Sequence, residues 1–343
     1  MKTMIRFLLI ISLALPTLTG CQASETPAPA SSPVTATELS SDEAPMEATL
    51  IQGNPSGLWY MLTTAISESL SDTYPGSILN ITPGSSGPNI LRLDASEADF
   101  AMLHSNLTYE AIYGLGGYEE THEHIRGIAS FYPSYVQFVL KEKFNITSFA
   151  QFIEEKPSVR ISIGSQGSST ADAFLRVLGA YDLTVEDLES WGCTIEYKGQ
   201  ADMSKMFSDG VLDGFFIIAA AQNPIIIENI VNTPMNFVVI EEPIIKELAE
   251  EYGYALGTIT QDNYDFLSQD LLTLTTYSML GASDQTPVDK AYKMAKTLHE
   301  NLDYLTSIHV SLADLNPEIL IDTHGIPLHP GAEMYYREIG LID

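Results

Sequence analysis

The sequence predicts an α/β fold with two lobes, each a mainly parallel sheet flanked by helices, and a cleft between the lobes. Short apolar runs of strand length alternate with helical patterns along the chain, which is typical of parallel sheets covered on both faces. Residues 48–343 are enough for two lobes rather than one. A weak internal duplication, in which strand, small-residue loop and helix occur twice in a similar order, also favours two similar lobes.

The first part of the pattern contains three strands, each followed by a helix. The apolar runs that predict these strands are 48–51, 77–82 and 98–104. The helical patterns that follow them are 58–70, 90–93 and 107–113. Glycine at 114 ends the last of these helices. A further apolar run at 135–140 predicts a strand at a crossing between the lobes.

The same alternation then recurs in the second part of the chain. Its predicted strands are 159–163, 194–197, 212–220 and 236–240. Its predicted helices are 148–155, 201–207, 243–252, one from Thr170 and one from Pro224 with Asn223 as its cap. The late run 271–282 predicts a strand that returns to the first lobe, with helices from Pro287 after it. The expected lobes are therefore 47–137 plus 272–343, and 138–271, with a hinge at the two crossings.

Asp99 and Asp213 occupy equivalent places in the two duplicated cycles. Each stands at the start of a buried strand, which is the end of the sheet opposite to the one where ligands bind. We therefore expect the two carboxylates to cap turns and not to form a catalytic pair.

The first 20 residues predict a lipoprotein signal peptide. Lys2 and Arg6 form a basic region, and the apolar run 7–15 is too short to span a bilayer as a helix. The residues Leu-Thr-Gly-Cys at 18–21 resemble a bacterial lipobox, which predicts a lipid on Cys21; a chance cysteine after an ordinary signal peptide is the alternative. Residues 22–46, poor in large apolar side chains, predict a disordered tether. We expect an exported protein that is anchored to the membrane by its lipid and lies in the periplasm or on the outer face.

The charge and the cysteines exclude several classes of function. The chain carries 16 Lys and Arg against 45 Asp and Glu, a formal net charge of −29, which makes nucleic acid an unsuitable partner. With Cys21 carrying lipid, Cys193 is the single remaining thiol. A disulfide framework and a cysteine-based metal site are therefore not expected.

Five loops at predicted strand ends, which we call the corners, are the candidate binding site. They span 53–57, 84–89, 104–106, 164–170 and 220–224. None of them contains Lys or Arg, and helices begin directly after several of them. Free N–H groups and the positive end of the helix dipole can bind a carboxylate there without a cation. Each corner taken alone also fits a plain turn with a helix cap. The interpretation as a binding site therefore depends on the five corners lying together in the fold.

The candidate ligand-binding residues come from these corners and from the helix behind the first one. They are Ser56, Gly57, Tyr60, Ser85, Ser86, Asn89, Ser105, Gly167, Ser168, Ser169, Thr170 and Asn223. Trp59 and Tyr60 start that helix, where aromatic residues belong to the core more often than to a pocket wall. If a cation is needed after all, Arg92 and Arg176 stand one or two turns into helices behind the corners.

Enzymatic motifs are missing from the sequence. It has no phosphate-binding loop, no H-E-x-x-H zinc motif and no G-x-S-x-G elbow. His122 and His124 could both face one metal from a strand, but a solvated acidic loop fits them better because no further ligand is close in sequence. We expect no catalytic residue, no metal and no cofactor.

Five stretches carry a resemblance to a known family: QGNPSGLWYML at 52–62, PGSSGPN at 83–89, IGSQGSSTADAFL at 163–175, DGFFIIAAAQNP at 213–224 and PLHPGAEMYYREIG at 327–340. Through these residues the chain resembles the TAXI family of solute-binding proteins, which serve tripartite ATP-independent periplasmic (TRAP) transporters. The first loop departs from the family because Asn54 and Pro55 interrupt its usual glycine and threonine run.

The resemblance implies a type II periplasmic-binding fold and no catalysis. It also implies a ligand such as glutamate, glutamine or 2-oxoglutarate, a small organic acid or amino acid, and an integral-membrane TRAP permease as partner. A receptor of an ATP-driven (ABC) importer or a sensor is the alternative in the same fold, and a cell-surface hydrolase is a third possibility. The ending that contains His324, His329 and Glu333 is implied to be an architectural element, not a metal site.

Overall fold

The computed structural model describes residues 44–53 and 57–343. The predictions for the signal peptide, for lipidation at Cys21, for the tether up to residue 43 and for Ser56 therefore lie outside the described residues. No helix in the described ranges is both long and apolar enough to span a bilayer.

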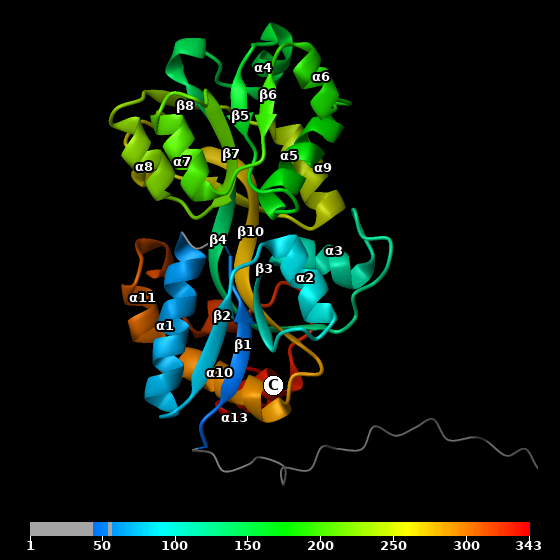
Figure 1. Ribbon diagram of the computed structural model, residues 1–343, viewed down its shortest axis with the longest axis vertical. Coiled ribbons are helices and arrows are strands. Elements are labelled where there is room, and N and C mark those ends of the chain that lie inside the picture. The colour runs from blue at the N-terminus through cyan, green and yellow to red at the C-terminus, as the bar shows by residue number, and fades with distance from the viewer. Residues whose placement is uncertain (1–43, 54–56) are drawn as a thin grey trace, which may run out of the picture. The chain divides into compact units, whose positions relative to one another are not determined.

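A mixed sheet runs through the whole folded body (Figure 1), and its strands follow the order β2-β1-β3-β10-β4-β7-β5-β6, with β8 beside β4 and β9 beside β10. The strands are β1 (Glu47–Ile51), β2 (Ile78–Thr82), β3 (Phe100–His104), β4 (Ile125–Lys141), β5 (Arg160–Ser162), β6 (Thr194–Glu196), β7 (Gly214–Ala219), β8 (Met235–Phe237), β9 (Ala255–Ile259) and β10 (Leu271–Ser283). Strands β2-β1-β3 and β7-β5-β6 are parallel. The long strands β4 and β10 are antiparallel to each other and join these two groups.

Helices pack around each group of parallel strands. They are α1 (Leu58–Thr73), α2 (Ser86–Asp94), α3 (Ser105–Tyr113), α4 (Phe149–Glu155), α5 (Ser169–Ala180), α6 (Val185–Ser190), α7 (Gln200–Ser208), α8 (Pro224–Ile230), α9 (Glu242–Tyr252), α10 (Val288–Glu300), α11 (Leu302–Ser307), α12 (Pro317–Ile321) and α13 (Pro330–Glu338). As predicted, Asn223 caps α8 by accepting from Ile225 N at 3.0 Å, and Pro224 takes its first position, where no N–H is needed.

Separate hydrophobic cores define the two lobes. Strand β4 contributes residues up to Tyr132 to the first lobe's core and residues from Val136 on to the second. Strand β10 changes core between Leu274 and Met279. Each long strand therefore passes from one lobe to the other within a few residues, and these passages are the backbone connections where a change of lobe angle has to be absorbed.

The prediction missed parts of the antiparallel framework. Strand β4 begins ten residues earlier than the predicted start at 135, at Ile125, and its first half contains Gly127 and Pro133, which both disfavour strand assignment from sequence. Strand β9 and helix α6 were not predicted. The edge strand β9 contains Gly257, and only Ile259 of its five residues is buried, so its hydrophobic pattern is weak.

Asp99 and Asp213 have matching structural roles, but the backbone hydrogen bonds of their carboxylates go to a neighbouring strand and not, as had been expected, to a turn. Asp99 Oδ2 accepts from the backbone N–H of Thr49 at 2.8 Å, and Asp213 Oδ2 accepts from that of Arg160 at 3.2 Å. Each carboxylate also pairs with a lysine ammonium group, Lys290 at 3.0 Å and Lys143 at 2.9 Å, respectively. The two carboxylates thus hold β1 in the first lobe and β5 in the second lobe in place.

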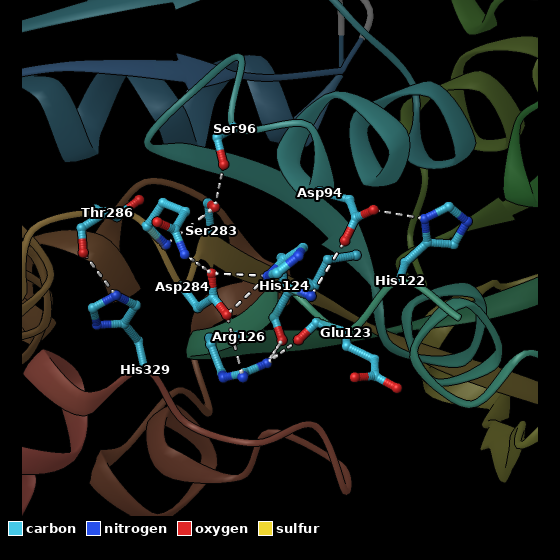
Figure 2. A network of polar contacts seen from close by, with 12 residues as sticks. Asp94, Ser96, His122, Glu123, His124, Arg126, Ser283, Asp284, Thr286 and His329 are labelled. Atoms are coloured by element: carbon cyan, nitrogen blue, oxygen red, sulfur yellow. Dashed lines mark hydrogen bonds and ion pairs between the residues drawn. The ribbon is translucent and has the colours of Figure 1, made fainter. Parts of the chain in front are cut away.

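The C-terminal motif is architectural. His329 caps α13 through Nδ1, which accepts from Gly331 N at 3.1 Å, while its Nε2 lies 3.0 Å from the carbonyl oxygen of Thr286 (Figure 2). The buried Tyr336 donates to the carbonyl of Ile128 at 3.0 Å. A Cβ at Gly331 would lie 2.2 Å from the carbonyl oxygen of Val288, so α13 packs directly on α10 at this glycine.

His122 and His124 do not face a common metal. Figure 2 shows each imidazole against a different carboxylate: His122 Nδ1 lies 2.9 Å from Asp94 Oδ2, and His124 Nδ1 lies 3.1 Å from Asp284 Oδ2. The hydrogen bond with Asp284 raises the pKa of the exposed His124. Across the described part of the chain, no group of three or more His, Cys, Asp or Glu side chains is placed to hold a metal ion.

Candidate functional site

A cavity of about 390 Å³ lies between the lobes at the carboxyl ends of the parallel strands. The first lobe contributes the starts of α1 and α2, the end of β3 and His309. The second lobe contributes the starts of α5, α7 and α8 and the end of β7. The lobes approach closely here, because a Cβ at Gly57 would lie 3.2 Å from Gln200 Oε1 on the opposite side.

His104 lies at the floor of the cavity and joins the two lobes. Its Nδ1 atom is 2.9 Å from Ser86 Oγ at the start of α2 and 2.7 Å from Ser169 Oγ at the start of α5. Burial lowers the pKa of His104 to about 3, so the imidazole is neutral at physiological pH. A neutral ring with two hydroxyls beside it offers hydrogen bonds without adding a charge to the site.

A polar and aromatic wall stands next to His104. The Trp59 ring centroid is 4.7 Å from that of His104, and Trp59 Nε1 donates to Ser278 Oγ at 2.9 Å. The hydroxyl of Ser134 is 3.2 Å from the same Ser278 oxygen, and burial raises the pKa of the neighbouring Tyr132 above its usual value. Since Ser134 and Ser278 belong to β4 and β10, the wall includes both strands that connect the lobes.

Three helices that begin at the cavity have no side-chain cap. Helices α1, α2 and α7 start after Gly57, Ser85 and Gly199, and none of these residues makes a capping hydrogen bond through a side chain. The N–H groups of a helix's first turn have no partner within the helix. Uncapped starts therefore present hydrogen-bond donors and the positive dipole end to the cavity, which is the chemistry that binds an anion.

The start of α5 is arranged differently. Ser168 caps the helix by accepting from Ala171 N at 3.2 Å. Thr170 Oγ1 accepts from the backbone N–H of Ile218 at 3.1 Å, which leaves its hydroxyl hydrogen available. Ser169 contacts His104 as described above. The three hydroxyls thus line the second lobe's side of the cavity. Those of Ser168 and Thr170 can donate to a ligand, and that of Ser169 can do so when His104 carries its proton on Nδ1.

The structure brings seven of the predicted site residues to the cavity. They are Gly57, Ser85, Ser86, Ser168, Ser169, Thr170 and Asn223. It places four others, Tyr60, Asn89, Ser105 and Gly167, outside the described lining. Of the aromatic pair that begins α1, Trp59 lines the cavity, whereas Tyr60 turns outward and is 46% exposed.

Asn89 and Ser105 hold the framework behind the cavity. The fully buried Asn89 amide donates to the carbonyls of Gln52 at 3.0 Å and Met102 at 2.8 Å, and its Oδ1 accepts from Ser85 N at 3.1 Å. Ser105 Oγ accepts from Tyr277 N at 3.0 Å and so links the start of α3 to β10. These side chains position the corners and have no free group directed at a ligand.

A sixth corner was missed in the sequence. Lys198, Gly199 and Gln200 line the cavity between β6 and α7, and this corner follows the pattern of the other five. Lys198 is the one Lys or Arg among the described lining residues, so the expectation of a site without cations is wrong at this position. It is partly exposed, with its Nζ atom 3.5 Å from Glu196 Oε2. The corner could have been found from the predicted strand at 194–197 and the helix from 201.

The two arginines considered as a missing charge lie elsewhere. Arg92 pairs with Glu97 at 3.1 Å on the surface of the first lobe. Arg176 pairs with Glu110 outside the described lining of the cavity. The described lining therefore combines neutral donors and helix starts with one lysine, Lys198, and one carboxylate, Glu228, so it offers places for an anionic and for a cationic group of a small ligand.

Comparisons with known proteins agree with the fold. The periplasmic binding protein BugD is 15% identical with a TM-score of 0.52, and the match covers 87% of this chain and 98% of that one. MatC from Rhodopseudomonas palustris, solved with bound malate, is 13% identical with a TM-score of 0.53, covering 86% and 97%, respectively. The predicted two-lobed periplasmic-binding fold is thus confirmed. A model of the NMT1-like family matches residues 51–340, and because this match spans most of the sequence, the chain belongs to the NMT1-like family.

Proposed function

We propose that this protein is an extracytoplasmic solute-binding protein that captures a small carboxylate between its lobes and delivers it to a membrane transporter. The observation that carries the proposal is the convergence of the starts of α1, α2, α5 and α7 on one cavity with a neutral histidine at its floor. Hydrogen bonds to a charged group contribute about 1.5–3 kcal/mol each, so a few of them account for the roughly −8 kcal/mol of micromolar binding.

The proposed contacts to the ligand are the hydrogen-bond donors and the ammonium group that line the cavity. The carboxylate is bound by the hydroxyls of Ser86, Ser169 and Thr170 and by the free N–H groups of α1, α2 and α7. Lys198, on the second-lobe side of the cavity, can bind a further anionic group of the ligand. The malate in the solved MatC structure is consistent with an organic acid as the ligand class in this fold.

Hydrolysis is a weaker alternative, although serine hydroxyls contact a histidine. A group whose pKa is lowered to about 3 is a poor general base near neutral pH. The contacts described for the His104 ring are Ser86, Ser169 and Trp59, and none of them is a carboxylate that could orient it. We therefore propose a receptor and not an enzyme.

Binding can be tested with the purified protein and pairs of compounds that differ in charge. Calorimetry with malate, glutamate and 2-oxoglutarate should detect binding, whereas analogues of the same size in which every carboxylate is replaced by an amide should bind at least tenfold more weakly. A ligand at about 100 times its Kd should raise the free energy of unfolding by about 2.7 kcal/mol. If the neutral amides bind as tightly as the acids, carboxylate recognition is wrong.

We further propose that a lipid on Cys21 anchors the protein and that a TRAP-type permease receives the ligand. Both proposals rest on the lipobox at 18–21 and on the resemblance to the TAXI family. Replacing Cys21 with serine should release the protein or leave its signal peptide uncleaved. Membrane association of a Cys21→Ser protein of mature length would refute the anchor, and an ATPase encoded beside the gene in place of a fused permease would favour the ABC importer.

A further inference from the structure

A buried ion pair joins the two lobes outside the ligand cavity. The guanidinium of Arg176 on α5 contacts both carboxylate oxygens of Glu110 on α3, in a bidentate pair. The Glu110 side chain is 0% exposed and that of Arg176 is 8% exposed. Asp172, one turn earlier on α5, lies 2.7 Å from Arg176 Nε and supports the guanidinium from its own helix.

Aromatic rings and a glycine enclose this pair. The Tyr252 ring centroid lies 4.0 Å from Arg176 Cζ and that of Tyr254 lies 5.9 Å from it. On the other side, a Cβ at Gly116 would be 2.2 Å from Glu110 Oε2 and 3.0 Å from Arg176 Nη2. The surrounding groups therefore leave little room for water to replace either partner while the lobes are in this arrangement.

The partners belong to different lobes. Helix α3 directly follows β3 in the first lobe, and α5 packs in the core of the second lobe through Phe174 and Val177. Neither Glu110 nor Arg176 lines the described cavity. The pair is thus a contact between lobes that a ligand in the cavity does not touch.

Burying one charge alone is far less favourable than burying a matched pair, whereas replacing both partners with apolar side chains is often tolerated. In an open arrangement, water would hydrate Glu110 and Arg176 separately. In the closed arrangement seen here, each charge has the other as its main partner. An unmatched charge at either position therefore disfavours closure and leaves the open state unaffected.

We propose that Glu110 and Arg176 form a latch that permits full closure of the lobes only when the two charges meet, and that this latch sets how tightly the protein holds its ligand. The second half of this proposal rests on the proposed ligand-binding function, because apparent affinity falls in proportion to the population of the binding-competent state. The first half concerns the protein alone.

Solution scattering of the unliganded and ligand-saturated protein tests the latch directly. Arg176→Met and Glu110→Leu should each give a larger radius of gyration than wild type under the same conditions. The double variant Glu110→Leu/Arg176→Met should return toward the wild-type radius, since neither charge of the buried pair remains and the Asp172 side chain, which is 33% exposed, can be hydrated. Arg92→Gln is the matched control, because it removes an arginine from the pair with Glu97 on the surface of a single lobe and should leave the radius unchanged.

Affinity for malate and for 2-oxoglutarate is the second readout. Each single variant should bind about tenfold to a hundredfold more weakly than wild type, and the double variant should recover most of this loss. Urea unfolding identifies any variant that fails to fold. Single variants that fold and scatter like wild type overturn the latch, as does a double variant at least as open as the singles. If wild type binds none of these acids, the proposed function fails, and the scattering comparison still decides the latch.

Discussion

The hydroxyl oxygen of Ser169 lies 2.7 Å from Nδ1 of His104, so the start of α5 in the second lobe meets the end of β3 in the first. On the same nitrogen, Ser86 approaches to 2.9 Å from the start of α2. One neutral imidazole at the floor of the cavity therefore contacts one hydroxyl from each lobe. A ligand bound there contacts both lobes, which is how binding energy can be coupled to closure.

Removing either hydroxyl should weaken binding without loss of the fold. We expect Ser86→Ala and Ser169→Ala each to lower the affinity for a bound carboxylate by about tenfold or more, since a hydrogen bond to a charged group contributes about 1.5–3 kcal/mol. Isothermal titration calorimetry measures the change. Ser190→Ala is the control, because this exposed hydroxyl donates to the carbonyl of Asp187 on the distant helix α6. Wild-type affinity in both cavity variants would exclude these hydroxyls from the site.

Asn89→Ala should affect stability more than recognition. The buried amide satisfies the carbonyls of Gln52 and Met102 and the N–H of Ser85, and its removal leaves these groups without a partner. We expect a loss of about 2–4 kcal/mol in the free energy of unfolding, measured by urea denaturation. Asn80→Ala, at an exposed position on β2, should change it by less than about 0.5 kcal/mol. A stable Asn89→Ala protein with reduced ligand affinity would instead make Asn89 a ligand contact.

His104 should give the protein a specific dependence of stability on pH. Its pKa is about 3 in the folded protein and about 6.5 when unfolded, so between these values the unfolded chain binds more protons. Stability from this residue is therefore complete above about pH 7 and is lost as pH falls toward 3. Between pH 7 and pH 5 wild type should lose about 2 kcal/mol more than His104→Gln. Equal losses in the two proteins would show that the imidazole is not held neutral by burial. Ligand affinity of wild type should be nearly constant from about pH 7 to 8, where His104 and His309, the two histidines described in the lining, are both neutral because burial lowers their pKa.

Strands and helices with a regular apolar pattern, and the corners between them, could be predicted from the sequence. The corners with Ser86 and Ser169 carry small residues before helices, and both residues reach the cavity. The contact that joins them through His104 could not be predicted, because it depends on how the lobes close. Asn89 stands in the same sequence context as the residues that reach the cavity, a corner of small residues followed by a helix. Its role is decided by the backbone carbonyls of Gln52, just after β1, and of Met102 in β3, which no short motif encodes.

Charge placement was hardest to predict. Lys198 stands in a short corner between small elements and was overlooked, although it follows the same strand-to-helix rule as the others. Arg176 and Glu110 are 66 residues apart in sequence and come together only across the lobe boundary. Such long-range pairs leave no periodic signal, so they become visible only when the topology is known.

Closure itself can be tested at Gly87, where the lobes touch outside the cavity. A Cβ at Gly87 would lie 2.6 Å from the carbonyl oxygen of Gly167, which is a backbone atom of the opposite lobe and cannot rotate away. Gly87 is the second residue of α2 and directly precedes Pro88, where a Cβ disfavours helical backbone, so alanine brings no gain in helix stability at this position. Gly87→Ala should therefore hold the lobes apart, and urea unfolding measures what the change costs the fold.

Gly87→Ala should bind malate or 2-oxoglutarate at least tenfold more weakly and should show a larger radius of gyration in the presence of the acid. Gly179→Ala is the matched control, because it makes the same change in helix α5 where a Cβ meets nothing within 4 Å. It should leave affinity and radius unchanged. If Gly87→Ala binds as tightly as Gly179→Ala, ligand capture does not require the lobes to approach as closely as they do here, and closure about residues 135–140 and 272–277 would have to be partial.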